Sequence, residues 1–177
     1  MLQVFGIATF SATAGSAFSG EVPDSKKIVH NIYGTVDEMK RDASLNEGVL
    51  VRTAGYYNVG DGGGAEFIIR KAKPNEGPGL IVLNNNLYAA LINVASVNYQ
   101  MFGAMGDGKN DDGIQIKMAH AYANQMDIPV VSHKGEYWIK ATNAIDIMTN
   151  VQWGDTIFHL DDKFNSISNN RFLVVSR

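Results

Sequence analysis

The chain contains no cysteine, and neither Lys nor Arg is gathered into a run anywhere along its 177 residues. Without cysteine, disulfides, thiolate metal sites and cysteine nucleophiles are excluded together. The formal charge of −3 and the pI near 5.7 provide no basic field that would attract a polyanion. The composition therefore argues against nucleic-acid binding.

Long apolar runs are absent as well, because no window of the sequence reaches the roughly 18 uninterrupted apolar residues that a membrane span needs. The first twenty residues are small and apolar, but no Lys or Arg precedes their apolar part, so they do not fit a secretory signal peptide. We therefore expect no targeting segment and a soluble protein. Apolar residues make up 45% of the chain, which is enough to build a core.

Residues 1–34 are interpreted as an N-terminal arm, because periodicity is weak there and Ser, Ala, Thr and Gly are frequent. This composition suits either a loose arm or a segment that becomes ordered against a partner. The apolar content is high for a solvated tail, and a partner surface would explain it. The candidate docking residues of the arm are Leu2, Val4, Phe5, Ile7, Phe10 and Phe18.

Residues 35–97 are predicted to form a small α+β module. Thr35, followed three residues later by Glu38, is a capping box in which the hydroxyl and the carboxylate satisfy N–H groups at a helix start. A short helix is expected from about residue 36 to 43. Strands are then expected over 48–57, 65–72 and, broken at three asparagines, 80–92, with a strand pair around Asp61.

The stretch FGAMGDGKNDDG, which begins at Phe102, contains three aspartates and several glycines and could in principle be a metal loop. A calcium-binding EF-hand loop that starts at Asp107 would need an oxygen ligand at its third position, glycine at its sixth and glutamate at its twelfth. Those positions hold Lys109, Asp112 and Met118, so the calcium hypothesis is disfavoured.

A phosphate-binding loop is a second alternative for the same stretch. Gly103, Gly108 and Lys109 fit its pattern, but Asn110 stands where a hydroxyl should bind magnesium, and the acidic pair that follows would repel a triphosphate. The third alternative is the start of a helix, where an acidic side chain accepts backbone N–H bonds and complements the helix dipole. We favour this third interpretation.

The helix that follows is expected to have one apolar face. The residues at helical spacing that would form this face are Ile114, Met118, Ala121 or Tyr122, and Gln125 or Met126. Short β segments separated by Gly, Asn and Asp turns then follow over 129–133, 136–140, 141–162 and 172–177. Their near-regular spacing is typical of stacked β rungs or of a sandwich.

Acidic residues in this second half could supply the two carboxylates of glycoside hydrolysis, and the candidates are Asp155, Asp161 and Asp162. A turn and a strand end explain these positions better. Asp61, in GDGGG, could mark a loop whose N–H groups hold an anion, although a hairpin turn is the preferred interpretation. No catalytic, cofactor-binding or metal-binding residue is therefore predicted, and no cofactor is expected.

Histidines and aromatic residues are further candidates for a functional role. The histidines are His30, His120, His133 and His159, and none has a nearby Ser or Asp motif, so packing is favoured over general-base work. The aromatic residues that could stack on sugar rings are Tyr56, Tyr57, Trp138 and Trp153, for which burial is the default.

Residues 97–139 resemble the N-terminal cap of the pectate-lyase-like superfamily of right-handed parallel β-helices, in which a strand, FGAxGDGxxDD, a helix with small residues and a valine-paired strand follow one another. The matching residues are Phe102, Gly103, Ala104, Gly106, Asp107, Gly108, Asp111, Asp112, Ala119, Ala121, Val130, Val131, Gly135 and Tyr137. Departures are Gly113, where threonine or serine is frequent, and His133 with Lys134, where proline is frequent. The preceding module is similar to one that often precedes this cap in bacteriophage tail spikes.

The resemblance implies a mixed α+β N-terminal module, here 35–97, followed over 98–177 by the capping helix and first rungs of a right-handed parallel β-helix, in a homotrimer. It implies the N-terminal region of a phage tail spike or tail fibre, located in the virion tail. Its expected partners are copies of itself, other tail or baseplate proteins through the arm, and host surface polysaccharide through downstream rungs. The alternative is a polysaccharide depolymerase, a lyase or glycoside hydrolase, with its groove in or downstream of this chain.

Overall fold

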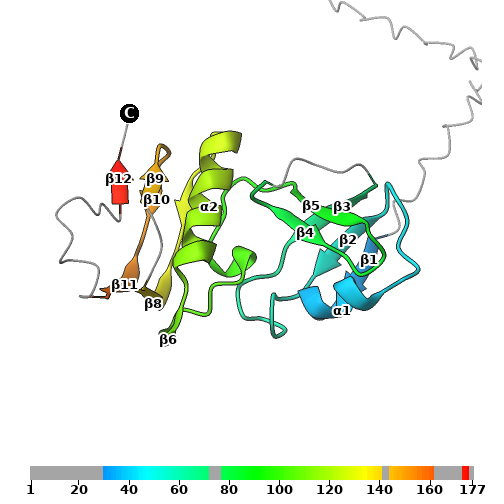
Figure 1. The fold of residues 1–177 in the computed structure, drawn as a ribbon, viewed down its shortest axis with the longest axis horizontal. Coiled ribbons are helices and arrows are strands. Elements are labelled where there is room, and N and C mark those ends of the chain that lie inside the picture. The colour runs from blue at the N-terminus through cyan, green and yellow to red at the C-terminus, as the bar shows by residue number, and fades with distance from the viewer. Residues whose placement is uncertain (1–29, 72–76, 141–143, 162–172, 176–177) are drawn as a thin grey trace, which may run out of the picture.

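The computed structural model describes residues 30–71, 77–140, 144–161 and 173–175. Figure 1 shows them as a sheet with one short helix, a group of short strands, and a longer helix, α2 (Gly113–Met126), between the two. The candidate docking residues of the N-terminal arm lie outside the described residues. Among the helices of the described ranges, none has the length and apolar character that crossing a membrane would require.

The first part is a five-stranded sheet with the order β1-β2-β3-β5-β4. β1 pairs with β2 in parallel, and all other neighbours in this sheet are antiparallel. The strands are β1 (His30–Tyr33), β2 (Leu50–Thr53), β3 (Glu66–Arg70), β4 (Leu80–Val82) and β5 (Tyr88–Ile92). The predicted strand pair around Asp61 and the two strands on either side of the asparagines are confirmed.

β1 was not predicted. The proposed arm ended at residue 34, whereas residues 30–33 form an edge strand of the sheet. The sequence could not reveal this strand because its partner β2 lies about twenty residues further on, and parallel pairing leaves no turn signal between the two strands. The described part of the module therefore begins at residue 30.

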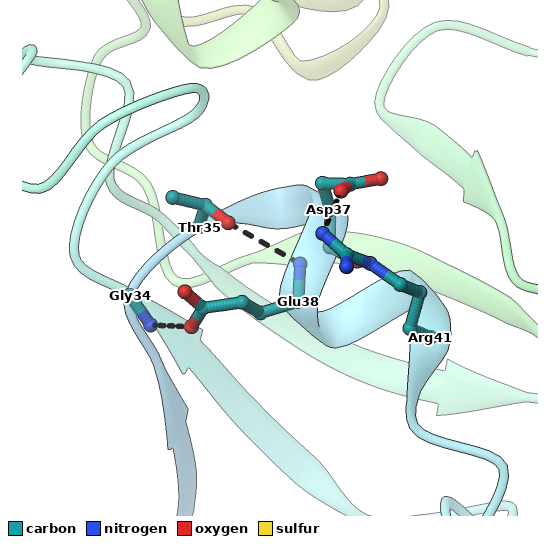
Figure 2. A network of polar contacts seen from close by, with 5 residues as sticks. All are labelled: Gly34, Thr35, Asp37, Glu38 and Arg41. Atoms are coloured by element: carbon teal, nitrogen blue, oxygen red, sulfur yellow. Dashed lines mark hydrogen bonds and ion pairs between the residues drawn. The ribbon is translucent and has the colours of Figure 1, made fainter.

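The short helix α1 (Val36–Arg41) is fixed by side chains at its first turn, as Figure 2 shows. Thr35 Oγ1 accepts the N–H of Glu38 at 3.2 Å, and Glu38 Oε2 accepts the N–H of Gly34 at 2.8 Å. The glutamate thus reaches one residue further back than the expected N–H of Thr35. Arg41 and Asp37 form an ion pair one turn apart on the exposed side of α1.

The helix α2 buries a different face from the predicted one. Its buried residues are Gly113, Ile116, Ala119, His120, Tyr122 and Ala123, whereas Ile114 is 62% and Met126 is 51% exposed. Half of these buried residues are small, and the helix lies close to η1 (Gln100–Phe102) and β9 (Ile145–Ile147). Of the predicted face, Tyr122 is buried and Met118 is half-buried against the core.

The remaining strands repeat in two successive rounds of the chain. They are β6 (Asp107–Asp111), β7 (Val130–Val131), β8 (Lys134–Ile139), β9, β10 (Val151–Gln152), β11 (Asp155–Leu160) and β12 (Leu173–Val175). β10 lies on β7, β11 on β8 and β12 on β9, and every pair is parallel. Stacked rounds with parallel pairing describe a β-helix, so the sandwich alternative is wrong.

Candidate functional site

The glycine–aspartate segment, residues 102–113, connects η1 to α2 and contains strand β6, where the sequence predicted only a turn. β6 pairs with β8 in parallel, and the register shifts between Asp107 and Asp111. Asp107 Oδ1 accepts the N–H groups of Lys109 at 2.9 Å and Asn110 at 3.0 Å. These bonds hold the pKa of Asp107 below its ordinary value and leave the carboxylate tied to its own turn.

Asp111 and Asp112 have different roles, although the sequence predicted only that an acidic side chain of this segment accepts N–H bonds at the helix start. Asp111 Oδ1 accepts the N–H of Gly113, the first residue of α2, and that of Lys140, both at 3.1 Å. Asp112 instead accepts the N–H groups of Met105 at 2.7 Å and Gly106 at 3.0 Å. One carboxylate therefore fixes the helix start to the end of β8, and the other closes the glycine turn.

Asp112 is 1% exposed, and its burial raises the pKa of its carboxyl although the two N–H bonds oppose that shift. A carboxyl with a raised pKa is a candidate general acid, but this one is enclosed by backbone and cannot reach a substrate. Within the described ranges, no group of three or more His, Cys, Asp or Glu side chains could hold a metal ion. The segment is organised as a structural support.

The loop around Asp61 also contradicts an anion site. Its N–H groups from Tyr56, Tyr57, Asn58 and Gly63 all point at the Asp61 carboxylate, at 2.8 to 2.9 Å. The carboxylate itself is the anion that these donors bind, so no exogenous anion is needed. This arrangement fits the hairpin-turn interpretation.

The sheet module and the β-helix meet at a junction in which two glycines allow close approach. A Cβ on Gly79 would lie 2.5 Å from the Tyr122 ring, and one on Gly103 would lie 2.7 Å from the Tyr56 ring. Both glycines have positive φ, 79° and 89°, so other residues would also be strained there. Tyr122 Oη donates to the carbonyl of Leu91 at 3.1 Å across this junction.

Two more hydrogen bonds cross the junction. Tyr57 Oη donates to the carbonyl of Gly103 at 3.0 Å, and Asn98 Nδ2 donates to the carbonyl of Gly62 at 3.0 Å. Tyr57, which was considered as a sugar-stacking residue, is therefore a tie between the two parts, even though the residue is 46% exposed. Tyr56 is half-buried and packs against the core.

The outward-facing side chains of β6, β8 and β11 form what we call the groove face. Trp138 stacks on His159 with ring centroids 5.5 Å apart, and Lys140 Nζ lies 5.4 Å from the Trp138 ring centroid. His159 Nε2 lies 3.4 Å from Glu136 Oε2. Beside them, a hollow of about 300 Å³ is lined by Gly106, Asp107, Lys134, Gly135, Glu136, Asp155 and Ile157.

Of the carboxylates considered for glycoside hydrolysis, Asp155 is exposed at the start of β11 and lines this hollow. Asp161 follows the end of β11, where its N–H donates to the carbonyl of Ile139 at 3.2 Å, and Asp162 lies outside the described residues. The structure therefore places Asp155 beside Glu136 and Asp107, two carboxylates that the sequence did not connect with it.

A buried polar network holds the interior of the β-helix. Tyr99 Oη accepts the indole N–H of Trp153 at 2.9 Å and lies 3.1 Å from His120 Nε2. Burial lowers the pKa of His120 to about 4, and burial raises the pKa of Tyr99. Gln100 Nε2 donates to Tyr137 Oη at 2.6 Å. His120 is thus a core residue, whereas His133 is exposed.

Sequence reasoning missed Tyr99 and Gln100, because their partners lie more than twenty residues away and no local pattern marks them. Trp153 is partly buried in this network and is not available to stack on a sugar. Trp138 is half-buried, and its indole nitrogen has no hydrogen-bond partner among the described residues.

No protein-family model matches the chain, and no curated protein sequence matches it. Among solved structures, the chain is similar to WceF of Pantoea stewartii, a glycan biofilm modifying enzyme with a bacteriophage tailspike-like parallel β-helix fold. The TM-score is 0.57 at 17% identity, over 75% of this chain and 21% of WceF. This chain therefore spans about a fifth of WceF, and it shares the tailspike-like parallel β-helix fold.

Two further solved structures are more distant. One is the tailspike protein gp49 of Acinetobacter baumannii bacteriophage Fri1, a capsular polysaccharide depolymerase, with a TM-score of 0.48 at 14% identity, over 68% of this chain and 22% of that one. The other is the enzymatically active domain of tailspike protein 2 of bacteriophage CBA120, with a TM-score of 0.45 at 18% identity, over 72% of this chain and 18% of that one. The fold assignment rests on WceF.

Proposed function

We propose that this chain is the N-terminal region of a bacteriophage tail spike or tail fibre, which attaches to the virion tail, assembles as a homotrimer and starts a right-handed parallel β-helix. The observation that supports the proposal most directly is the junction. A sheet module is joined to the first rounds of a parallel β-helix by close glycine contacts and by hydrogen bonds. Such a unit suits anchoring and alignment of a longer β-helix.

The chemistry of the glycine–aspartate segment supports a structural role. Its three carboxylates are occupied by backbone N–H groups, which order the turn, begin α2 and attach it to β8. We infer that α2 caps the β-helix and that this segment nucleates the first round. Among the described residues, β10, β11 and β12 pair with a strand on one side, so their other edges could offer hydrogen bonds to further rounds.

The partners follow from this role. Residues 1–34 would contact another tail or baseplate protein, and residues 30–33 of this segment also form the edge strand β1 of the sheet. Host surface polysaccharide would be bound by the β-helix beyond the two rounds described. WceF is described as a glycan biofilm modifying enzyme, and the tailspike-like fold that the chain shares with it is consistent with a glycan-directed protein.

A depolymerase is the second candidate function, and the hollow on the groove face favours it. Glu136, Asp155 and Asp107 line that hollow, and glycoside hydrolysis needs two carboxylates on either side of the scissile bond. Asp107, however, has a lowered pKa and is tied to its own turn, which suits neither a general acid nor a mobile base. A hydrolase that used this hollow would therefore depend on Glu136 and Asp155, and the alternative is a catalytic groove downstream of these rounds.

Two measurements on the purified chain test the proposal. Light scattering should give three times the chain mass of 19.3 kDa. Incubation with a panel of bacterial capsular polysaccharides and lipopolysaccharides should change neither the viscosity nor the number of reducing ends. A monomeric mass would contradict the assembly role, and cleavage by the chain alone would replace the structural function with the depolymerase.

A further inference from the structure

The five-stranded sheet has a second apolar face, which we call the outer sheet face. Along each strand, buried side chains alternate with side chains that point to the other side. The apolar residues on that side are Ile32, Leu50, Ile68, Leu80, Val82, Tyr88, Ala90 and Ile92, in register across neighbouring strands. An antiparallel sheet with one solvated face would normally place polar residues there.

The outer sheet face is not part of the core. The core of the module contains Val51, Phe67, Ile69 and Ala89 together with Val36 and Met39 of α1, so α1 covers the opposite face. None of the apolar residues of the outer sheet face belongs to the core cluster or packs against it. Ile32 is 73% and Val82 is 60% exposed, at the two ends of the face. The apolar residues between these two ends are half-buried, and a contiguous, partly exposed apolar surface of this kind marks an interaction site.

The face also contains unpaired charges of both signs. Arg52 lies directly opposite Glu66 in the β2–β3 register, yet no ion pair within the described residues involves either side chain. Glu66 accepts only a hydrogen bond from Asn93 Nδ2 at 3.2 Å, among the bonds of the described residues. A hollow of about 570 Å³ lies at this end of the face, lined in part by Ile32, Arg52, Glu66 and Ile92.

We propose that the outer sheet face binds a second copy of this chain. An arginine and a glutamate that lie side by side and leave each other unpaired make the face complementary in charge to itself. In a threefold assembly the contact is head-to-tail, so the β1–β2 half of one face meets the β3–β5–β4 half of the next. Arg52 of one copy then pairs with Glu66 of its neighbour, and the apolar rows are buried between them. This inference rests on the self-assembly in the proposed function and names the surface that performs it.

Charge reversal tests the contact on the full chain. Arg52→Glu and Glu66→Arg each place like charges across the contact, so each variant alone should associate about tenfold more weakly or worse in light scattering. In a threefold ring that contains both variants, two of the three contacts regain opposite charges and one stays like-charged, so an equimolar mixture should recover association in part. Recovery in the mixture cannot come from the cross-strand pair within one chain, because that pair stays like-charged in both variants.

Apolar variants give an independent measurement. Val82→Glu should weaken association, whereas Ile157→Glu should not, because Ile157 is also an exposed strand residue but lies on the groove face. Circular dichroism checks that each variant is folded. A wild-type trimer that both charge reversals leave intact would overturn this inference while the assembly role stands. A wild-type monomer would overturn both, and loss of association in the variants without recovery in the mixture would overturn the Arg52–Glu66 contact.

Discussion

Removal of the Asp61 carboxylate by Asp61→Ala should destabilise the sheet module and loosen its junction with the β-helix. The carboxylate accepts four backbone N–H groups, of which those of Tyr56 and Gly63 are part-buried and those of Tyr57 and Asn58 are exposed. Water can replace the bonds to the exposed groups, so the cost comes chiefly from the other two.

The magnitude follows from those two bonds. A hydrogen bond to a charged group contributes about 1.5 to 3 kcal/mol when fully buried, and about half of that is reasonable at a part-buried loop. The free energy of unfolding should therefore fall by about 1.5 to 3 kcal/mol. For a chain of this length, that loss lowers the Tm by about 5 to 10 °C. Thermal unfolding followed by circular dichroism measures it.

The effect of Asp61→Ala should also depend on pH. Burial alone would raise the pKa of Asp61, but the four N–H bonds outweigh it, and the pKa lies below its ordinary value of 3.8. A lowered folded-state pKa contributes stability that is present above the unfolded pKa and is lost as the pH falls through the folded one. The difference between wild type and Asp61→Ala should therefore shrink below pH 4.

Asp37→Ala is a matched control, because Asp37 is an exposed carboxylate whose side chain pairs only with Arg41 among the described residues. Its Tm should change by less than about 2 °C. If Asp61→Ala changes the Tm as little as this control does, the reasoning about the Asp61 loop is wrong.

Three further predictions follow from the interior. Gly79→Ala should lower the free energy of unfolding, measured with urea, by at least about 2 kcal/mol, because the φ of Gly79 is positive and the added Cβ would clash with the Tyr122 ring. An unchanged free energy of unfolding would refute the close contact at the junction. Ile116→Ala should lower the free energy of unfolding by about 2 to 4 kcal/mol, whereas Ile114→Ala should hardly change it. A larger loss for Ile114→Ala than for Ile116→Ala would support the helix face predicted from the sequence. Burial lowers the pKa of His120 from 6.5 to about 4, so the unfolded state takes up a proton at a higher pH than the folded state does, and stability should fall as the pH drops from 6.5 to 4. His120→Gln should make stability depend less on pH in this range. An unchanged pH dependence in the variant would contradict the neutral burial of His120.

Features that depend on neighbouring residues could be predicted from the sequence. The turn chemistry around Asp61 and the asparagines, and the Thr35 position before α1, are local, and the strand pairs and the helix lie where those signals indicate. Prediction of the fold class depended on the glycine–aspartate pattern, because no single strand of the β-helix has a distinctive sequence. Stacking in rounds shows only in the parallel pairing of β7 to β12.

Features that depend on distant residues could not be predicted. The face of α2 was misassigned because large apolar residues were assumed to point inward, whereas Ala119, Ala123 and His120 do so. Tyr99 fills the space next to the helix and offers His120 a hydroxyl, which makes a polar residue acceptable in the core. The groove-face neighbours Glu136 and Asp155 are 19 residues apart in sequence and come close only because β11 lies on β8.

The junction has a mechanical consequence. A hinge requires a stretch of backbone that can rotate, but here the backbone of two glycines packs directly against Tyr56 and Tyr122. Three hydrogen bonds also connect the sheet module to the β-helix. Rotation of one part about the other would have to break these bonds together. Torque applied to the β-helix would therefore be transmitted to the five-stranded sheet, because the two parts rotate as one rigid unit.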